Sequence, residues 1–261
     1  LPNVDPTGLE EFSVVFTDRS LNHMSEVFQP VMRDISAMLG EVYNADAHPV
    51  LARGYSYRQE DLDAARAERI HHVLTDEPGR DSLAEFYNGL NLTEFGDENV
   101  AEALQAIPEE DHSRGWREGE ALAEAWLGDH RQCEFPWPFN RDLRHHRASL
   151  PGAELVGFIG ETEAEARFAF GQVKTSKQQR NPPRVVNHGQ KSLINQMLQL
   201  RDDLNIKKTI VHYLLFRAMR DAGLVGKARA ATTRWLQSDF MEIVLFGVLV
   251  YLGKTTRVGK R

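Results

Sequence analysis

Alternation of hydrophobic and polar residues predicts two neighbouring β-strands in the second half of the chain. In RFAFGQVKTS, residues 167–176, a period of two places Gln172 and Lys174 on one face, together with two phenylalanines. PGAELVGFIG, residues 151–160, is predicted to form the preceding strand. The two segments are separated by a short polar stretch, which predicts a hairpin.

The register of this hairpin decides whether its polar side chains meet. If the turn between the strands is centred on Glu163, Glu154 lies directly opposite Gln172. Directly opposed side chains have Cβ atoms roughly 5 Å apart. An acid, an amide oxygen and the Lys174 ammonium would then lie together, whereas a slip of one residue would separate them.

A helix is predicted before these strands, over RGWREGEALAEAWLGDH, residues 114–130. Trp116, Ala123 and Leu127 follow helical spacing and define an apolar stripe. Glu120 falls on this stripe, whereas the neighbouring glutamates lie at its edge or on the far side. An inward carboxylate needs a partner or a metal ion, so Glu120 is a candidate functional residue.

The remaining pattern predicts an α/β fold, a mixed sheet flanked by helices, with a largely helical N-terminal region. A possible capping box at Ser56 and Gln59 indicates a helix start. Helical spacing predicts further helices, and an apolar run predicts a last strand, in the following ranges: helices over 56–74, 82–90, after Asp97, 191–204 and 208–222, and a strand over 241–251.

Composition is that of an ordinary globular protein. The chain has 261 residues, of which 41% are hydrophobic and 26% charged. One cysteine, Cys133, rules out an internal disulfide and fits a reducing compartment. The sequence lacks an export signal and an apolar run of about 18 residues, so we expect a cytoplasmic protein with no membrane partner.

Charge is distributed unevenly between the two halves. Of 31 basic and 38 acidic residues in total, residues 141–261 hold 21 basic and 10 acidic ones. The C-terminal half is therefore basic and the first 140 residues are strongly acidic. A basic half suits a polyanion such as nucleic acid, while the acidic half could shield that surface, contact a partner or simply be solvated.

The order of helix, strand and strand, with Glu120, Glu154 and Gln172-Val173-Lys174, resembles the PD-(D/E)xK nuclease superfamily. The resemblance covers about residues 114–175 and extends in outline to residue 261. Glu154 stands where that family usually has aspartate, and Gln172 stands where glutamate is commonest. Glutamine at this position occurs in some branches of the superfamily. The resemblance implies a restriction endonuclease-like sheet and phosphodiester hydrolysis.

The resemblance also assigns roles to these residues. Glu120, Glu154 and Gln172 would bind Mg²⁺, with Mn²⁺ as the alternative ion, because hard divalent cations prefer carboxylate and carbonyl oxygens. Lys174 would position the attacking water or stabilise charge that develops on the phosphate. All four are therefore predicted catalytic residues, although a Gln-x-Lys pair can also be an ordinary strand with polar residues.

Residues 1–46 resemble the N-terminal segment of class V, alanine-glyoxylate-type aminotransferases. The resemblance ends there, and the first lysine of the chain is Lys174, which lies in an unrelated context. No Schiff-base lysine follows the segment, so we expect neither pyridoxal phosphate nor transaminase activity. The predicted organisation is an aminotransferase-like segment (1–46), a helical region (47–110) and a nuclease domain (111–261).

Two basic loops flank the predicted strands, RDLRHHR before them and KTSKQQRNPPR after them. They could contact phosphates or could be ordinary solvated loops. The predicted nucleic-acid-binding residues are Arg144, Arg147, Lys177, Arg180, Arg184 and Lys191. DNA is the expected partner and RNA the alternative. The resemblance adds a second copy of the chain, or a helicase or sensor subunit, as an expected protein partner.

Two hypotheses follow for function. The first is a Mg²⁺-dependent DNA endonuclease acting in bacterial restriction or anti-phage defence, a setting that the resemblance alone implies. The second is a catalytically weakened nuclease-fold module that binds nucleic acid or a partner protein. The neutral Gln172 in place of an acid is what favours the second hypothesis.

Overall fold

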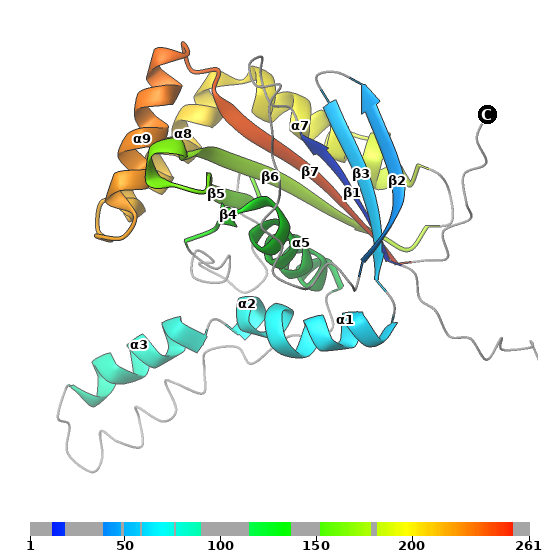
Figure 1. Cartoon of the computed structure of the whole chain (residues 1–261), viewed down its shortest axis with the longest axis horizontal. Coiled ribbons are helices and arrows are strands. Elements are labelled where there is room, and N and C mark those ends of the chain that lie inside the picture. The colour runs from blue at the N-terminus through cyan, green and yellow to red at the C-terminus, as the bar shows by residue number, and fades with distance from the viewer. Residues whose placement is uncertain are drawn as a thin grey trace, which may run out of the picture.

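A mixed sheet of seven strands organises the part of the chain that the structure describes (Figure 1). The computed structural model describes residues 12–18, 39–47, 50–57, 59–75, 77–89, 115–136, 152–178 and 182–252. Within them the strands are β1 (Phe12–Asp18), β2 (Leu39–Ala47), β3 (Val50–Tyr57), β4 (Cys133–Glu134), β5 (Leu155–Ile159), β6 (Arg167–Ser176) and β7 (Ile243–Leu252). Their order in the sheet is β2-β3-β1-β7-β6-β5-β4.

The hairpin of β5 and β6 has the predicted register. Leu155 lies opposite Gly171, which is the register expected for a turn centred on Glu163, and the strand pairing ends at Leu155. The connection contains the short 3₁₀ turn η4 (Glu163–Glu165), which includes the predicted centre of the turn. The predicted pairing of the strands is therefore confirmed.

β6 pairs with β7 in parallel, whereas every other strand pair is antiparallel. Parallel neighbours need a crossover, and helices supply it here. The intervening helices are α6 (Arg184–Asn187), α7 (Leu193–Asp202), α8 (Leu204–Ala218) and α9 (Val225–Gln237). Ser192 caps the N-terminus of α7 and Asp203 caps that of α8, each by accepting backbone N–H hydrogen bonds.

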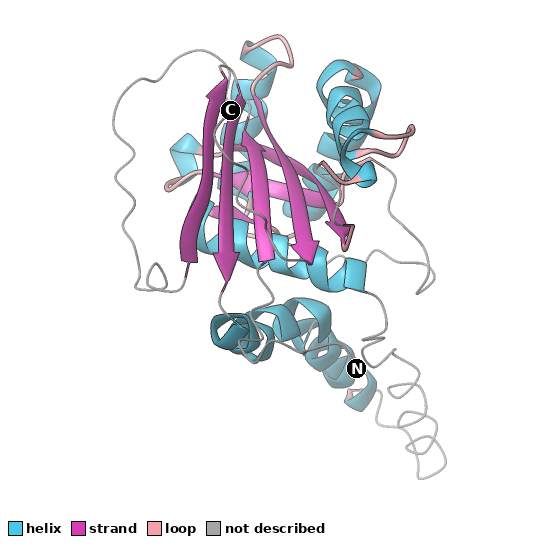
Figure 2. Cartoon of the chain, turned by 90° about the vertical axis from the view of Figure 1, so that its right-hand side faces the viewer, coloured by secondary structure: helices cyan, strands magenta, loops and turns pink. Residues whose placement is uncertain are grey.

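Helices lie on both sides of the sheet (Figure 2). The crossover helices cover one face, where Phe168 and Phe170 of β6 pack among buried residues of α8 and α9, including Leu214 and Trp235. This face confirms the predicted period of two, because Ala169 and Val173 belong to the separate core on the opposite face. Alternate side chains of β6 thus pack into two separate hydrophobic cores, one on each face of the sheet.

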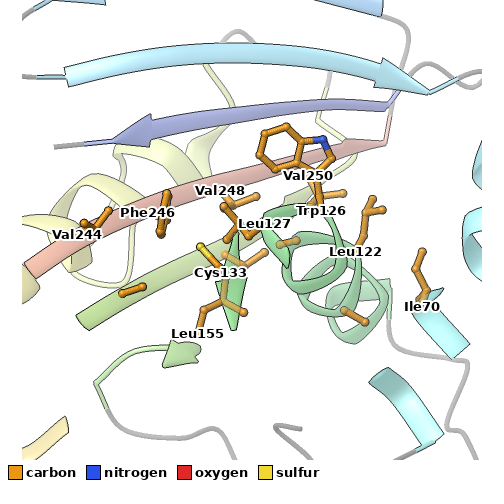
Figure 3. Packing of buried hydrophobic residues seen from close by; sticks show 14 of the residues in the cluster. Ile70, Leu122, Trp126, Leu127, Cys133, Leu155, Val244, Phe246, Val248 and Val250 are labelled. Carbon is orange, nitrogen blue, oxygen red and sulfur yellow. The ribbon is translucent and has the colours of Figure 1, made fainter. Parts of the chain in front are cut away.

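The opposite face is covered by α5 (Gly115–Arg131), the helix that was predicted over residues 114–130. Trp126 and Leu127 of this helix pack against Val248 and Val250 of β7 (Figure 3). On the far side of α5 lie α1 (Gln59–Ala65), the π-helical turn η2 (Arg66–Ile70), α2 (His71–Thr75) and α3 (Glu77–Asn88), of which η2 and α2 contact α5. Ile70 extends the core outward.

The structure corrects the predicted N-terminal organisation in part. The region was expected to be largely helical, but it also supplies β1, β2 and β3, which join the sheet through β7. Ser56 is not a helix cap, because it belongs to β3 and pairs with Ser13 and Gly40. The helix predicted after Asp97 lies outside the described residues.

Two further expectations differ from the structure. Trp116 was placed on the buried stripe of α5 but has 36% of its surface exposed, because it lies in the first turn of the helix. α9 was not predicted, since its buried face consists of Ala228, Ala231 and Trp235 rather than of a run of large apolar residues. Among the described helices, none is long and apolar enough to cross a membrane.

Candidate active site

An ion pair between β6 and the residue preceding β5 forms the centre of the site. The Lys174 ammonium donates a hydrogen bond to Glu154 Oε1 at 2.9 Å. The two side chains have 16% and 19% of their surface exposed, so both groups are shielded from much of the surrounding water while remaining reachable. A partly buried pair of this kind interacts more strongly than one on an open surface.

The position of Glu154 follows from the different lengths of the two strands. β5 begins at Leu155, so the part of β6 beyond Gly171 has no β5 partner. The Glu154 backbone N–H still donates to the Gly171 carbonyl at 2.9 Å, and the other carboxylate oxygen, Oε2, accepts the backbone N–H of Val173. One carboxylate therefore replaces the missing strand partner and also holds the Lys174 ammonium.

Gln172 is held in one orientation by the backbone. Its side chain is 1% exposed, and its Nε2 donates to the carbonyl oxygen of Gly152. Its Oε1 is buried and has no hydrogen-bond partner among the described residues. Buried polar atoms are usually satisfied, so an orphaned acceptor calls for an explanation such as a bound water or ion.

Glu120 of α5 supplies a second carboxylate near the ion pair. The pKa of Glu120 is raised to about 8, mainly by burial and also by the negative charge of Glu154. The positive charges of Lys174 and Arg117 act in the opposite direction on this pKa. Glu120 therefore lies within electrostatic reach of the ion pair, and its Oε2 is buried without a hydrogen-bond partner among the described residues.

The oxygen donors of this arrangement suit a hard divalent cation. Two carboxyl groups and one amide carbonyl offer the ligand types that Mg²⁺ prefers, and one oxygen each of Glu120 and Gln172 is buried without a hydrogen-bond partner among the described residues. Within the described ranges no group of three or more His, Cys, Asp or Glu side chains is placed to hold a metal ion.

Three participants were not singled out from the sequence. The Val173 N–H and the Gly152 carbonyl are backbone groups, and no residue type marks them in advance. Arg117 was recognisable in principle, because it precedes Glu120 by three residues on a helix and such residues are neighbours. Of the predicted residues, Glu154 and Lys174 thus contact each other directly, whereas Glu120 is linked to them by the effect of their charges on its pKa.

The predicted nucleic-acid-binding residues are only partly described. Lys177 follows β6, Arg184 begins α6 and Lys191 precedes α7, and all three are exposed. Both α6 and α7 contact β6, which places these helices beside the strand that carries Gln172 and Lys174. The other three predicted residues, Arg144, Arg147 and Arg180, lie outside the described residues.

Comparison of the chain with models of known protein families, with curated protein sequences and with solved structures finds no match. A functional assignment therefore depends on the residues of the site and on the resemblance that their motif carries.

Proposed function

We propose that the chain is a metal-dependent nuclease of the PD-(D/E)xK type that hydrolyses phosphodiester bonds. The observation that carries the proposal is the Lys174–Glu154 pair at 2.9 Å with the Glu120 carboxylate in its field. A lysine ammonium among carboxylates on adjacent elements is the charge arrangement that phosphodiester hydrolysis uses. The two orphaned acceptor oxygens beside the pair support the same assignment.

In this proposal Glu120, Glu154 and Gln172 hold Mg²⁺, with Mn²⁺ as a substitute. When bound, the ion neutralises charge on a phosphate oxygen and lowers the pKa of water. Gln172 presents Oε1 in a fixed direction because its Nε2 is anchored on Gly152. Binding of a cation would satisfy the oxygens of Gln172 and Glu120 that are otherwise buried without partners.

Lys174 has the second role. Its ammonium is held in place by Glu154 Oε1, so its remaining donors are oriented before substrate binds. A fixed cation next to the scissile phosphate stabilises the negative charge that develops during attack and positions the attacking water. Glu154 therefore contributes twice, as a ligand and as the partner that orients Lys174.

DNA is the proposed substrate. Lys177, Arg184 and Lys191 are exposed on segments next to β6, where their positive charges would neutralise backbone phosphates of a bound strand. Such contacts position a strand without reading its sequence. The motif resemblance further suggests restriction or anti-phage defence as the setting, with a second copy of the chain or a helicase or sensor subunit as partner.

The test is cleavage of supercoiled plasmid, single-stranded DNA and RNA by the purified chain, with Mg²⁺ or Mn²⁺ and with EDTA. We expect metal-dependent cleavage that Lys174→Met lowers by at least 100-fold. Lys208→Met is the matched control, because the Lys208 ammonium lies over the Phe240 ring and is not a member of the ion pair. A folded wild-type chain that cleaves none of these substrates contradicts the proposal.

One observation favours a second candidate, a nuclease-fold module that binds nucleic acid without cutting it. Both oxygens of Glu154 are already engaged, by Lys174 and by Val173, and Gln172 brings no negative charge to the site. Weak metal affinity would then leave binding as the only activity. This candidate predicts a shift of labelled DNA by the wild-type chain, with no product at any metal concentration.

A further inference from the structure

We propose that Gly119 is a positioning residue, which lets α5 approach β6 at Thr175 and thereby sets the distance of Glu120 from the Glu154–Lys174 pair. The inference rests on the proposed function, because its consequence is read in metal binding and cleavage. Gly119 is neither a proposed metal ligand nor a residue that contacts substrate.

The packing at Gly119 leaves no space for a side chain. Gly119 is buried, and a Cβ atom built on it would overlap the hydroxyl oxygen of Thr175. The same Cβ would lie 3.4 Å from Thr175 Cβ and 3.6 Å from Thr175 Cγ2, which are ordinary contact distances. The obstacle to a larger residue is therefore a single atom, the Thr175 Oγ1.

A glycine within a helix has a cost that indicates a packing reason. Glycine is roughly 1 kcal/mol less favourable than alanine inside a helix. Gly119 lies in α5, four residues before Ala123 and eight before Leu127, and all three are buried. This stripe of α5 faces the core that includes Ala169 and Val173 of β6. Gly119 is the point of the stripe where the helix backbone comes closest to Thr175.

Glu120 follows Gly119 directly, so any displacement of the helix at this contact displaces Glu120 as well. The pKa of Glu120 responds to the charges of both Glu154 and Lys174, which places its carboxyl group within electrostatic reach of that pair. Misplacement of a catalytic group by about 1 Å can reduce a rate about 100-fold. The approach of α5 to β6 therefore controls the geometry of the site.

The contact is steric rather than polar. Thr175 Oγ1 is buried and has no hydrogen-bond partner among the described residues. Its removal loses no hydrogen bond, so Thr175→Ala should fold and retain the site. In that variant a methyl group at position 119 would meet Thr175 Cβ at a tolerable 3.4 Å. Thr175→Ala should consequently rescue Gly119→Ala.

The experiment compares four variants with the wild-type chain, namely Gly119→Ala, Thr175→Ala, Gly119→Ala with Thr175→Ala, and Gly119→Ala with Thr175→Val. Valine keeps the branched shape of threonine and lacks only the hydroxyl, so it is the matched control for a steric effect. The measurements are the Mn²⁺ dissociation constant by calorimetry, kcat and KM for plasmid DNA, and the unfolding temperature.

We expect Gly119→Ala to weaken Mn²⁺ binding at least threefold and to lower kcat at least tenfold, with KM within about twofold of wild type. In the double variant with Thr175→Ala, the Mn²⁺ dissociation constant and kcat should return to within about threefold of their values in Thr175→Ala alone. The double variant with Thr175→Val should stay impaired. If Gly119→Ala does not fold, the comparison of the first double variant with Thr175→Ala still decides the question.

Two results overturn the inference in different ways. An active wild-type chain whose Gly119→Ala variant binds Mn²⁺ and cleaves normally, or whose impairment Thr175→Ala does not relieve, removes the positioning role alone. A folded wild-type chain that neither binds Mn²⁺ nor cleaves any nucleic acid removes the proposed function, and the positioning role falls with it.

Discussion

Glu154 accepts two hydrogen bonds, one with each carboxylate oxygen. The Lys174 ammonium donates the first at 2.9 Å, and the backbone N–H of Val173 donates the second. The side chain of the residue before β5 thus continues the hydrogen bonding of the hairpin past the point where the strand pairing ends. The same contacts fix the lysine of the motif. The Glu154 carboxylate consequently links the end of the strand pairing to the ion pair of the candidate site.

Glu154→Gln should separate the structural and catalytic contributions of this carboxylate. An amide keeps the shape and an acceptor for Val173 but loses the charge that holds Lys174, so we expect a loss of about 1–3 kcal/mol in the free energy of unfolding. Cleavage should fall at least 100-fold. Urea denaturation and initial cleavage rates measure the two effects.

The Lys174→Met variant completes a double-mutant cycle with Glu154→Gln. The effects of the two substitutions on the free energy of unfolding should not add, because both remove the same ion pair. Additive effects would mean that the pair contributes nothing to stability in solution.

Gln172→Glu tests whether the glutamine is a degraded acid or an adapted amide. A carboxylate cannot donate to the Gly152 carbonyl, which now accepts the Gln172 Nε2, and it would add a negative charge near Glu154. We expect a loss of about 1–3 kcal/mol in stability and no gain in cleavage. Gln178→Glu is the matched control. Gln178 is exposed, and its side chain makes its hydrogen bond through Oε1, which accepts the backbone N–H of Arg184 and which a carboxylate retains.

A Gln172→Glu variant that is as stable as wild type and cleaves faster would contradict this account. It would show that the position tolerates the acid that the superfamily commonly has there, and that the anchor on Gly152 is dispensable.

The pH dependence of stability should report on Glu120. The pKa of Glu120 is about 8 in the folded chain, above its ordinary value of 4.5, because burial and Glu154 oppose its ionisation. The folded state therefore binds more protons than the unfolded state between these values, and stability should fall as the pH rises from about 5 to 8. The decline should be on the order of 3 kcal/mol in the metal-free chain.

Glu120→Gln should remove this decline, whereas Glu165→Gln at an exposed carboxyl should keep it. Denaturation curves in EDTA across this pH range measure both variants. A slope that is the same in Glu120→Gln as in wild type would exclude Glu120 as its source.

The exposed cations next to β6 should affect substrate binding more than chemistry. Lys191→Ala is expected to weaken DNA binding two- to tenfold, to reduce the slope of log affinity against log salt by about 1, and to leave kcat nearly unchanged. Arg229→Ala is the matched control, because Arg229 is exposed on α9, which packs against η4 at the opposite end of β6.

Equal effects of these two substitutions on DNA affinity would show that binding follows total charge rather than the surface beside β6. Fluorescence anisotropy with labelled DNA at several salt concentrations measures the difference.

The hairpin and α5 were predictable because each presents a simple periodic pattern. In β6 the alternation serves a different core on each face, and Ala123 and Leu127 of α5 are fully buried as their spacing predicted. The assumed turn at Glu163 then gave the register of the hairpin as far as Leu155. Local pattern and one short turn therefore predicted that Glu154 and Lys174 lie close together, as their ion pair confirms.

The rest depended on long-range contacts or on weak patterns. β1 is stabilised in the sheet by pairing with β3 and β7, of which β7 lies more than 200 residues away, so its neighbours could not be inferred from local sequence. α9 buries mainly alanines, which give little apolar contrast. The hydrogen bond from the Val173 N–H to the Glu154 carboxylate forms because β5 begins only at Leu155. No residue type marks that boundary in the sequence.

The central claim is that Glu120, Glu154 and Gln172 surround one metal ion beside Lys174. Anomalous X-ray scattering from crystals of the chain grown with Mn²⁺ tests it most directly. The account predicts one Mn²⁺ bound by oxygens of Glu120, Glu154 and the Gln172 amide, and its absence in Glu154→Ala. A chain that crystallises folded in millimolar Mn²⁺ with no ion at these residues, or with the ion elsewhere, would contradict it.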